Sequence, residues 1–153
     1  MSQRRKAREI ALQILYSLDS VGCACEEVIR DCLNLLDNDN ECERNGELSQ
    51  TVKDFAIFLV RGTWQNCEAI DKLIVDHTDN WSFARIAKTD KAIIRMACFE
   101  LCYCDDIPNN VSINEAVELA KVYGADNAPS FVNGVLDSIA STVSSDKPKE
   151  IKA

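Results

Sequence analysis

Basic side chains at the start of the chain are the strongest candidates for chemistry in this sequence. Within the first 16 residues, four basic residues stand against one acidic residue, although the whole chain carries a net charge of −8. The four are Arg4, Arg5, Lys6 and Arg8. Guanidinium groups offer forked N–H donors that suit phosphate oxygens, and a local basic segment on an acidic protein is typical of a nucleic-acid contact. The alternative is that these residues only increase solubility.

An aromatic side chain stands at helical spacing from two of these arginines. Spacings of three, four and four residues place one set of side chains on a common helix face, here called the basic-aromatic stripe: Arg5, Arg8, Leu12 and Tyr16. An aromatic ring can stack on an unpaired base while guanidiniums hold phosphates, a combination suited to single-stranded RNA. An apolar stripe is centred near Ala11 and Leu18, so we expect the basic-aromatic stripe to lie away from the core.

Residue patterns typical of enzymes are missing from the sequence. There is one histidine, His77, and neither a Gly-x-Ser-x-Gly elbow nor a Gly-x-x-x-x-Gly-Lys phosphate loop occurs. Nucleophilic or acid-base catalysis needs several such groups to converge. We therefore expect no enzyme and no catalytic residues.

The eight cysteines do not form a recognisable metal-binding pattern. No Cys-x-x-Cys pair occurs, and His77 belongs to no set of four ligands with zinc spacing. An acidic segment beginning at Asp37 fails as a calcium loop, because position six is Cys42 and position twelve is Leu48. We expect reduced thiols in the core or on the surface, with no metal ion and no cofactor.

Hydrophobic periodicity predicts an all-α protein of about seven helices. Only 5 glycines and 3 prolines are present, and apolar residues recur at spacings of three and four along most of the chain. The expected helices cover residues 4–18, 26–36, 48–77, 81–86, 89–104, 112–123 and 126–143, with Gly62 as a point where the third bends or breaks. No apolar run approaches the roughly 18 residues that span a bilayer, and no leader with an apolar centre is recognisable. We expect no membrane association and a cytoplasmic location.

Local signals suggest where several of these helices begin and end. Thr89 is a candidate N-cap, and Ser112 and Glu115 have capping-box spacing. Gly124 is well placed just after a helix, and Pro129 suits the first turn of the last one.

Six segments, in order along the chain, resemble the NusB family of bacterial transcription antitermination factors. They are residues 4–17 (RRKAREIALQILYS), 89–95 (TDKAIIR), 99–101 (FEL), 106–108 (DIP), 113–121 (INEAVELAK) and 131–137 (FVNGVLD). Between residues 21 and 80 only the helical pattern is similar. The resemblance implies one domain over residues 1–143, made of two small helical bundles over about 4–77 and 82–143, with a frayed tail over 144–153.

The resemblance also implies a function. Family members bind boxA-type single-stranded RNA in nascent ribosomal RNA transcripts as a heterodimer with the small-subunit ribosomal protein NusE, within an RNA polymerase antitermination complex. Carried over by position, the RNA-binding residues are Arg4, Arg5, Lys6, Arg8, Gln13, Tyr16, Phe131 and Asn133.

Two further positions follow from the same resemblance. Asp90 matches a position that faces the ribosomal-protein partner, although an acid there would also stabilise the start of a helix. Asn127 stands where some relatives carry an acid, which removes a negative charge near the expected RNA surface.

Alternatives remain open at this stage. A helical adaptor that binds only proteins would use its basic segment for solubility or for an acidic partner surface. A NusB-like domain at the front of an RNA methyltransferase would need a further domain for the methyl donor, which we do not expect here. The sequence leaves open whether the chain forms a homodimer. The net charge of −8 predicts weak RNA binding by the isolated chain.

Overall fold

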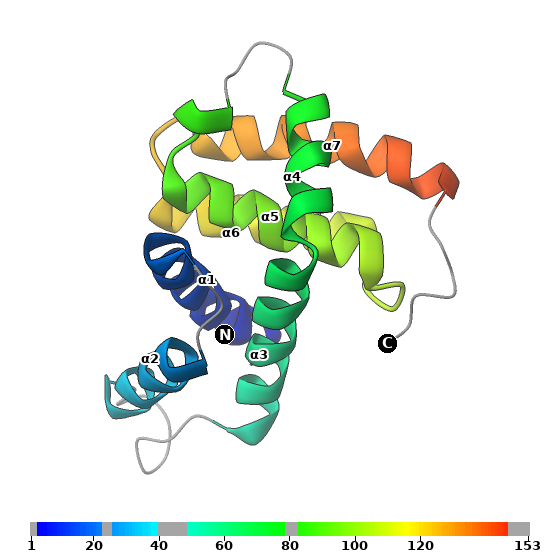
Figure 1. Cartoon of the computed structure of the whole chain (residues 1–153). Helices are drawn as coiled ribbons and strands as arrows, with labels where there is room; N and C mark the ends of the chain where they lie inside the picture. Colours follow the sequence, from blue (N-terminus) through cyan, green and yellow to red (C-terminus); the bar gives the residue numbers. More distant parts are fainter. Residues whose placement is uncertain (1–2, 23–25, 40–48, 79–82, 147–153) are drawn as a thin grey trace. The chain divides into compact units, whose positions relative to one another are not determined.

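The computed structural model describes residues 3–22, 26–39, 49–78 and 83–146, and every regular element among them is helical (Figure 1). The elements are α1 (Gln3–Val21), α2 (Glu26–Asp39), α3 (Gln50–Gln65), α4 (Cys67–Asp76), the 3-10 helix η2 (Phe83–Arg85), α5 (Lys88–Tyr103), α6 (Asn109–Tyr123) and α7 (Ala128–Asp146). The expectation of an all-α fold is confirmed. Part of the acidic segment that begins at Asp37, at residues 40–48, and the end of the tail, 147–153, lie outside the described residues.

The chain divides into two compact units, residues 1–64 and 65–153. The first contains α1, α2 and nearly all of α3, and the second contains α4 through α7. The division falls about one helix earlier than the boundary expected near residue 77. Helix α4 therefore belongs with the C-terminal helices, and it packs on α5 and α7.

The first unit contains the strongly amphipathic α1, which packs against α2 (Figure 1). The apolar stripe expected around Ala11 and Leu18 is present, since both residues are completely buried, as are Ala7 and Ile14. Helix α3 supplies its own buried stripe, which consists of Val52, Ala56, Leu59, Val60 and Thr63.

In the second unit, α5 is apolar on nearly all sides. Ten of its 16 residues are buried, and α6, α7 and α4 all contact it. A helix that is buried all round must also satisfy its polar groups internally. Glu100 does so, because Ser112 on α6 donates a 2.9 Å hydrogen bond to its Oε1 while both residues are 1% exposed.

Two helix starts differ from the sequence prediction. Helix α5 begins at Lys88 after Ala87, and α6 begins at Asn109 after Pro108. The capping roles expected for Thr89 and Ser112 are therefore wrong, because both lie inside helices. In contrast, Gly124 directly follows α6 and Pro129 lies in the first turn of α7, as expected.

The long helix expected over residues 48–77 is two helices. It is interrupted at Asn66, four residues after Gly62, and Gly62 itself is helical. Helix α7 continues to Asp146, three residues beyond the expected end.

An ion pair joins α4 to α5. Arg95 donates from Nε to Asp71 Oδ1 at 2.7 Å and from Nη2 to Asp71 Oδ2 at 2.9 Å, a bidentate arrangement. The side chains are only 13% and 27% exposed. Partial burial makes this pair stronger than a surface contact.

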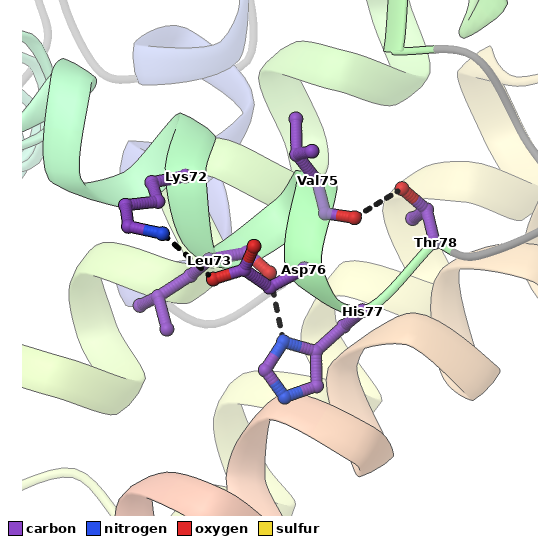
Figure 2. Close-up of polar contacts among 6 residues, drawn as sticks. All are labelled: Lys72, Leu73, Val75, Asp76, His77 and Thr78. Atoms are coloured by element: carbon purple, nitrogen blue, oxygen red, sulfur yellow. Dashed lines mark hydrogen bonds and ion pairs between the residues drawn. The ribbon is translucent and has the colours of Figure 1, made fainter.

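The end of α4 is fixed by two polar side chains that directly follow the helix (Figure 2). His77 Nδ1 donates to the carbonyl oxygen of Leu73 at 2.8 Å, and the Thr78 hydroxyl donates to the carbonyl oxygens of Ile74 and Val75. His77 Nε2 also lies 3.1 Å from the Thr142 hydroxyl oxygen on α7. Both ring nitrogens of the single histidine thus have structural contacts.

Candidate nucleic-acid interface

The start of α1 presents cations where a helix favours anions. Arg4 and Arg5 are exposed and Lys6 is half-buried, and the first turn contains no acidic residue. A basic residue near a helix N-terminus interacts unfavourably with the helix dipole, by about 0.3–1 kcal/mol when exposed. Local helix stability therefore does not explain this cluster, whereas contact with an anionic ligand would.

Arg4 is oriented by an aromatic ring on α3. Its guanidinium carbon lies 4.5 Å from the centroid of the Phe55 ring, within the range of a cation–π contact. Stacking occupies a face of the planar guanidinium, and the N–H donors of this group lie in its plane. Phe55 thus holds an RNA-binding candidate on the surface of the first unit.

Arg8 does not lie where the sequence predicted. This residue is 3% exposed, and its guanidinium carbon lies 5.6 Å from the same Phe55 centroid. Leu12 is also 3% exposed, so the middle of the basic-aromatic stripe is buried. The expectation that the whole stripe lies away from the core is wrong, because α1 is buried on more than one side.

The two ends of the stripe remain accessible. Arg5 is exposed and Tyr16 is 43% exposed, which is unusual for a large aromatic side chain. Gln13, one turn before Tyr16, is also exposed.

Two of the expected RNA-binding residues lie on α7, in the second unit. Phe131 is half-buried in the first turns of the helix, and Asn133 is exposed. Asn127 directly precedes α7, and its carbonyl oxygen accepts the amide hydrogen bond of Phe131 at 3.2 Å. These residues thus lie at the start of α7, within the second unit.

Asp90, the expected partner-facing acid, is buried in the first turn of α5. It is 7% exposed, and its Oδ1 has no hydrogen-bond partner among the described residues. Burial raises the pKa of its carboxyl above the ordinary value. Gly124 lies against it, since a Cβ atom there would be 2.8 Å from Asp90 Oδ1 and 2.6 Å from Ala128 Cβ.

Sequence reasoning missed the aromatic pair on α3. Neither Phe55 nor Phe58 is among the residues that the sequence predicted to bind RNA. The i, i+3 spacing of two phenylalanines on one helix was the available signal. Their closeness to Arg4 and Arg8 depends on how α3 packs, which periodicity does not predict.

The described residues contain neither a group of ligands for a metal ion nor a membrane-spanning helix. In the described ranges, no group of three or more His, Cys, Asp or Glu side chains could hold a metal ion. The cysteines described there belong to no disulfide bond: Cys32, Cys67, Cys98, Cys102 and Cys104. Among the described helices, none combines the length and hydropathy that crossing a bilayer requires.

Comparison with known sequences identifies the family of the chain. The sequence profile of the NusB family matches residues 5–141. A transcription antitermination protein NusB from Syntrophus aciditrophicus is 45% identical over 139 residues, which cover 91% of this chain and 80% of that protein. Its counterpart from Geotalea daltonii is 45% identical over 144 residues, covering 94% and 97%.

Solved structures give the same result. A T. maritima NusB is similar with a TM-score of 0.79 and 31% identity, covering 98% of this chain and 96% of that one. A structure of the antitermination factors NusB and NusE in complex with double-stranded RNA contains a chain with a TM-score of 0.77 and 25% identity, covering 93% and 98%.

Proposed function

This chain belongs to the NusB family, and from that membership we propose that it is a transcription antitermination factor that binds boxA-type single-stranded RNA in nascent ribosomal RNA transcripts. Its proposed partner is the ribosomal protein NusE, and the two act within an RNA polymerase antitermination complex. The names of the relatives support the antitermination role, and the similar structure that contains NusB, NusE and double-stranded RNA supports NusE and RNA as partners.

The observation that carries the proposal is the exposure of Arg5 and Tyr16 on one face of α1. The helix rises about 1.5 Å per residue and turns about 100°, so the two side chains lie about 16 Å apart along the axis and within about 20° of each other. One end of this face suits a phosphate and the other suits an unpaired base. Phe131 and Asn133 on α7 are also proposed to bind RNA, on the basis of their positions in the family.

The net charge supports a need for a partner. An acidic chain with a small basic cluster attracts RNA weakly over long distances. A basic ribosomal protein bound beside it would add cations that neutralise further phosphates. We therefore propose that the heterodimer is the RNA-binding form.

The start of α5 is proposed to belong to the partner interface. Because Asp90 is 7% exposed, the partner would contact only a small part of its side chain. The Asp90→Asn variant keeps the shape and removes the charge. It should weaken NusE binding in a pull-down or titration, and an unchanged affinity would remove Asp90 from the interface.

The RNA contact is tested by the salt dependence of binding. For a single strand, each lost phosphate contact flattens the slope of log affinity against log salt by about 0.7. Arg5→Ala should weaken binding and flatten the slope, whereas Lys72→Ala, at an exposed cation on α4, should change neither. Unchanged affinity and slope in an Arg4→Ala, Arg5→Ala double variant would remove α1 from the binding site.

The same titration distinguishes single-stranded from duplex RNA. Tyr16 can stack only on a base that is not already stacked within a helix. Single-stranded RNA should therefore bind more tightly than a duplex of the same sequence. Equal affinity for both RNAs would mean that the arginines bind phosphates of a duplex as well as those of a single strand. This result would contradict the assignment to single-stranded RNA.

A further inference from the structure

Two stacked phenylalanines on α3 form an aromatic surface beside the arginines of α1. The Phe55 and Phe58 rings have centroids 6.1 Å apart and planes inclined by 21°, an offset stack. Phe55 is half-buried, but Phe58 is 44% exposed. Core packing explains a buried aromatic side chain and does not explain one that is nearly half exposed to solvent.

The pair is continuous with the cationic cluster. The guanidinium carbons of Arg4 and Arg8 lie 4.5 and 5.6 Å from the Phe55 centroid, so one ring contacts both arginines and also stacks with Phe58. N–H groups that can bind a phosphate and an exposed aromatic face thus occur on adjoining side chains within a single compact unit. Cationic grooves with aromatic platforms are the usual way to bind single-stranded nucleic acid.

The charges next to Phe58 favour a base over a phosphate at this position. Asp54, one turn before it, is exposed and accepts a hydrogen bond from Gln50. Arg61, one turn after it, is bound at 2.8 Å by Glu26 of α2. The carboxylate of Asp54 repels a phosphate, and the ion pair with Glu26 weakens the attraction of Arg61 for one. An uncharged nucleobase can still stack on the ring between them.

We propose that Phe58 is a stacking platform for an unpaired base of the RNA whose phosphates are held by the arginines of α1. Phe55 is a positioning residue, because it orients both Arg4 and the Phe58 ring. The inference rests on the proposed RNA-binding function and adds α3 to the binding surface. Phe58 contributes to RNA affinity by stacking, and this contribution does not depend on the salt concentration.

The test is a set of Phe58 variants in the full-length protein bound to NusE, titrated with single-stranded boxA-like RNA. Removal of an aromatic platform lowers affinity by at least about fivefold. Phe58→Ala and Phe58→Leu should both show this loss with an unchanged salt slope, and Phe58→Tyr should restore wild-type affinity. Val75→Ala, at a 50% exposed apolar residue of α4, is the matched control and should have no effect.

The comparison of Leu with Tyr separates stacking from folding. Both side chains fill the space of Phe58, but only Tyr retains an aromatic face. RNA substituted with 5-iodouracil should also crosslink on irradiation to a peptide that contains Phe58. Wild-type affinity in Phe58→Leu, or a crosslink that never falls on α3, would overturn the proposal.

The arms of the experiment keep this inference distinct from the proposed function. If the wild-type complex binds no boxA-like RNA, the function itself fails. If it binds and Arg5→Ala flattens the salt slope while Phe58→Leu binds normally, only the stacking role of Phe58 fails. If Phe58→Leu instead loses NusE binding in the absence of RNA, the aromatic surface docks a protein and the proposal is wrong.

Discussion

The guanidinium carbon of Arg8 lies 5.6 Å from the centroid of the Phe55 ring, and this arginine is 3% exposed. Arg5, one turn earlier on α1, is exposed. The two arginines therefore have different tasks. Arg5 lies on the surface of α1, while Arg8 contributes to the packing of the first unit and helps to orient the ring that also contacts Arg4.

The first prediction separates these tasks by substitution. Arg8→Ala removes a buried side chain and should lower the free energy of unfolding by about 1–3 kcal/mol, since a buried arginine stabilises through packing as well as charge. Arg5→Ala should change it by less than about 0.5 kcal/mol. Urea denaturation measures both values. An Arg8→Ala variant as stable as the wild type would show that its packing is unimportant.

A second prediction concerns the ion pair between α4 and α5. Asp71→Ala removes two charge-assisted hydrogen bonds from Arg95 and should cost about 1.5–3 kcal/mol of unfolding free energy. Asp76 on the same helix pairs with Lys72, but these side chains are 52% and 77% exposed. Asp76→Ala should therefore cost less than about 1 kcal/mol. Similar losses in the two variants would contradict the assigned difference in burial.

Gly124 should tolerate no side chain. A Cβ atom there would meet Ala128 Cβ at 2.6 Å and both Asp90 Oδ1 and the carbonyl oxygen of Ala120 at 2.8 Å. Gly124→Ala should lower thermal stability by the equivalent of about 1–3 kcal/mol. Gly134 is the matched control, because nothing lies within 4 Å of a Cβ atom at that helical position. Gly134→Ala should be neutral or stabilise the protein by up to about 1 kcal/mol.

Asp90 should make stability depend on pH. Its pKa in the folded protein is raised by burial above the ordinary value of 3.8. The folded state thus holds the proton more tightly, and the resulting stabilisation is complete below the unfolded pKa and lost as the pH rises through the folded pKa. Relative to Asp90→Asn, which cannot ionise, the wild type should become less stable as the pH rises from about 4 towards neutral.

Urea denaturation of both proteins across that pH range measures the difference. A difference that stays constant, or that shifts in favour of the wild type as the pH rises, would contradict the effect of burial on this carboxyl.

Much of the fold follows from local patterns. The apolar stripe of α1, the glycine after α6 and the proline in the first turn of α7 were predictable, because each depends on neighbours within a few residues. The starts of α5 and α6 were not. Ser112 had the sequence context of a cap, but its hydroxyl instead satisfies the buried Glu100, which is 12 residues away.

The candidate site was also predictable where it depends on helical spacing, and not where it depends on the packing of helices. Helical spacing correctly brought Arg5 and Tyr16 to one accessible face. It could not show that Arg8 is buried or that Phe58 is exposed, since both depend on the packing of α1 and α3. Motif similarity indicated Asp90 as partner-facing, but its burial against Gly124 is a tertiary property.

The central claim is tested most directly by titrating boxA-like single-stranded RNA into this protein with and without saturating NusE. We predict that NusE raises RNA affinity at least tenfold, equivalent to about 1.4 kcal/mol of coupling, and that RNA tightens the protein pair by the same factor. Equal RNA affinity with and without demonstrably bound NusE would contradict cooperative RNA recognition and would favour a helical adaptor that binds only proteins.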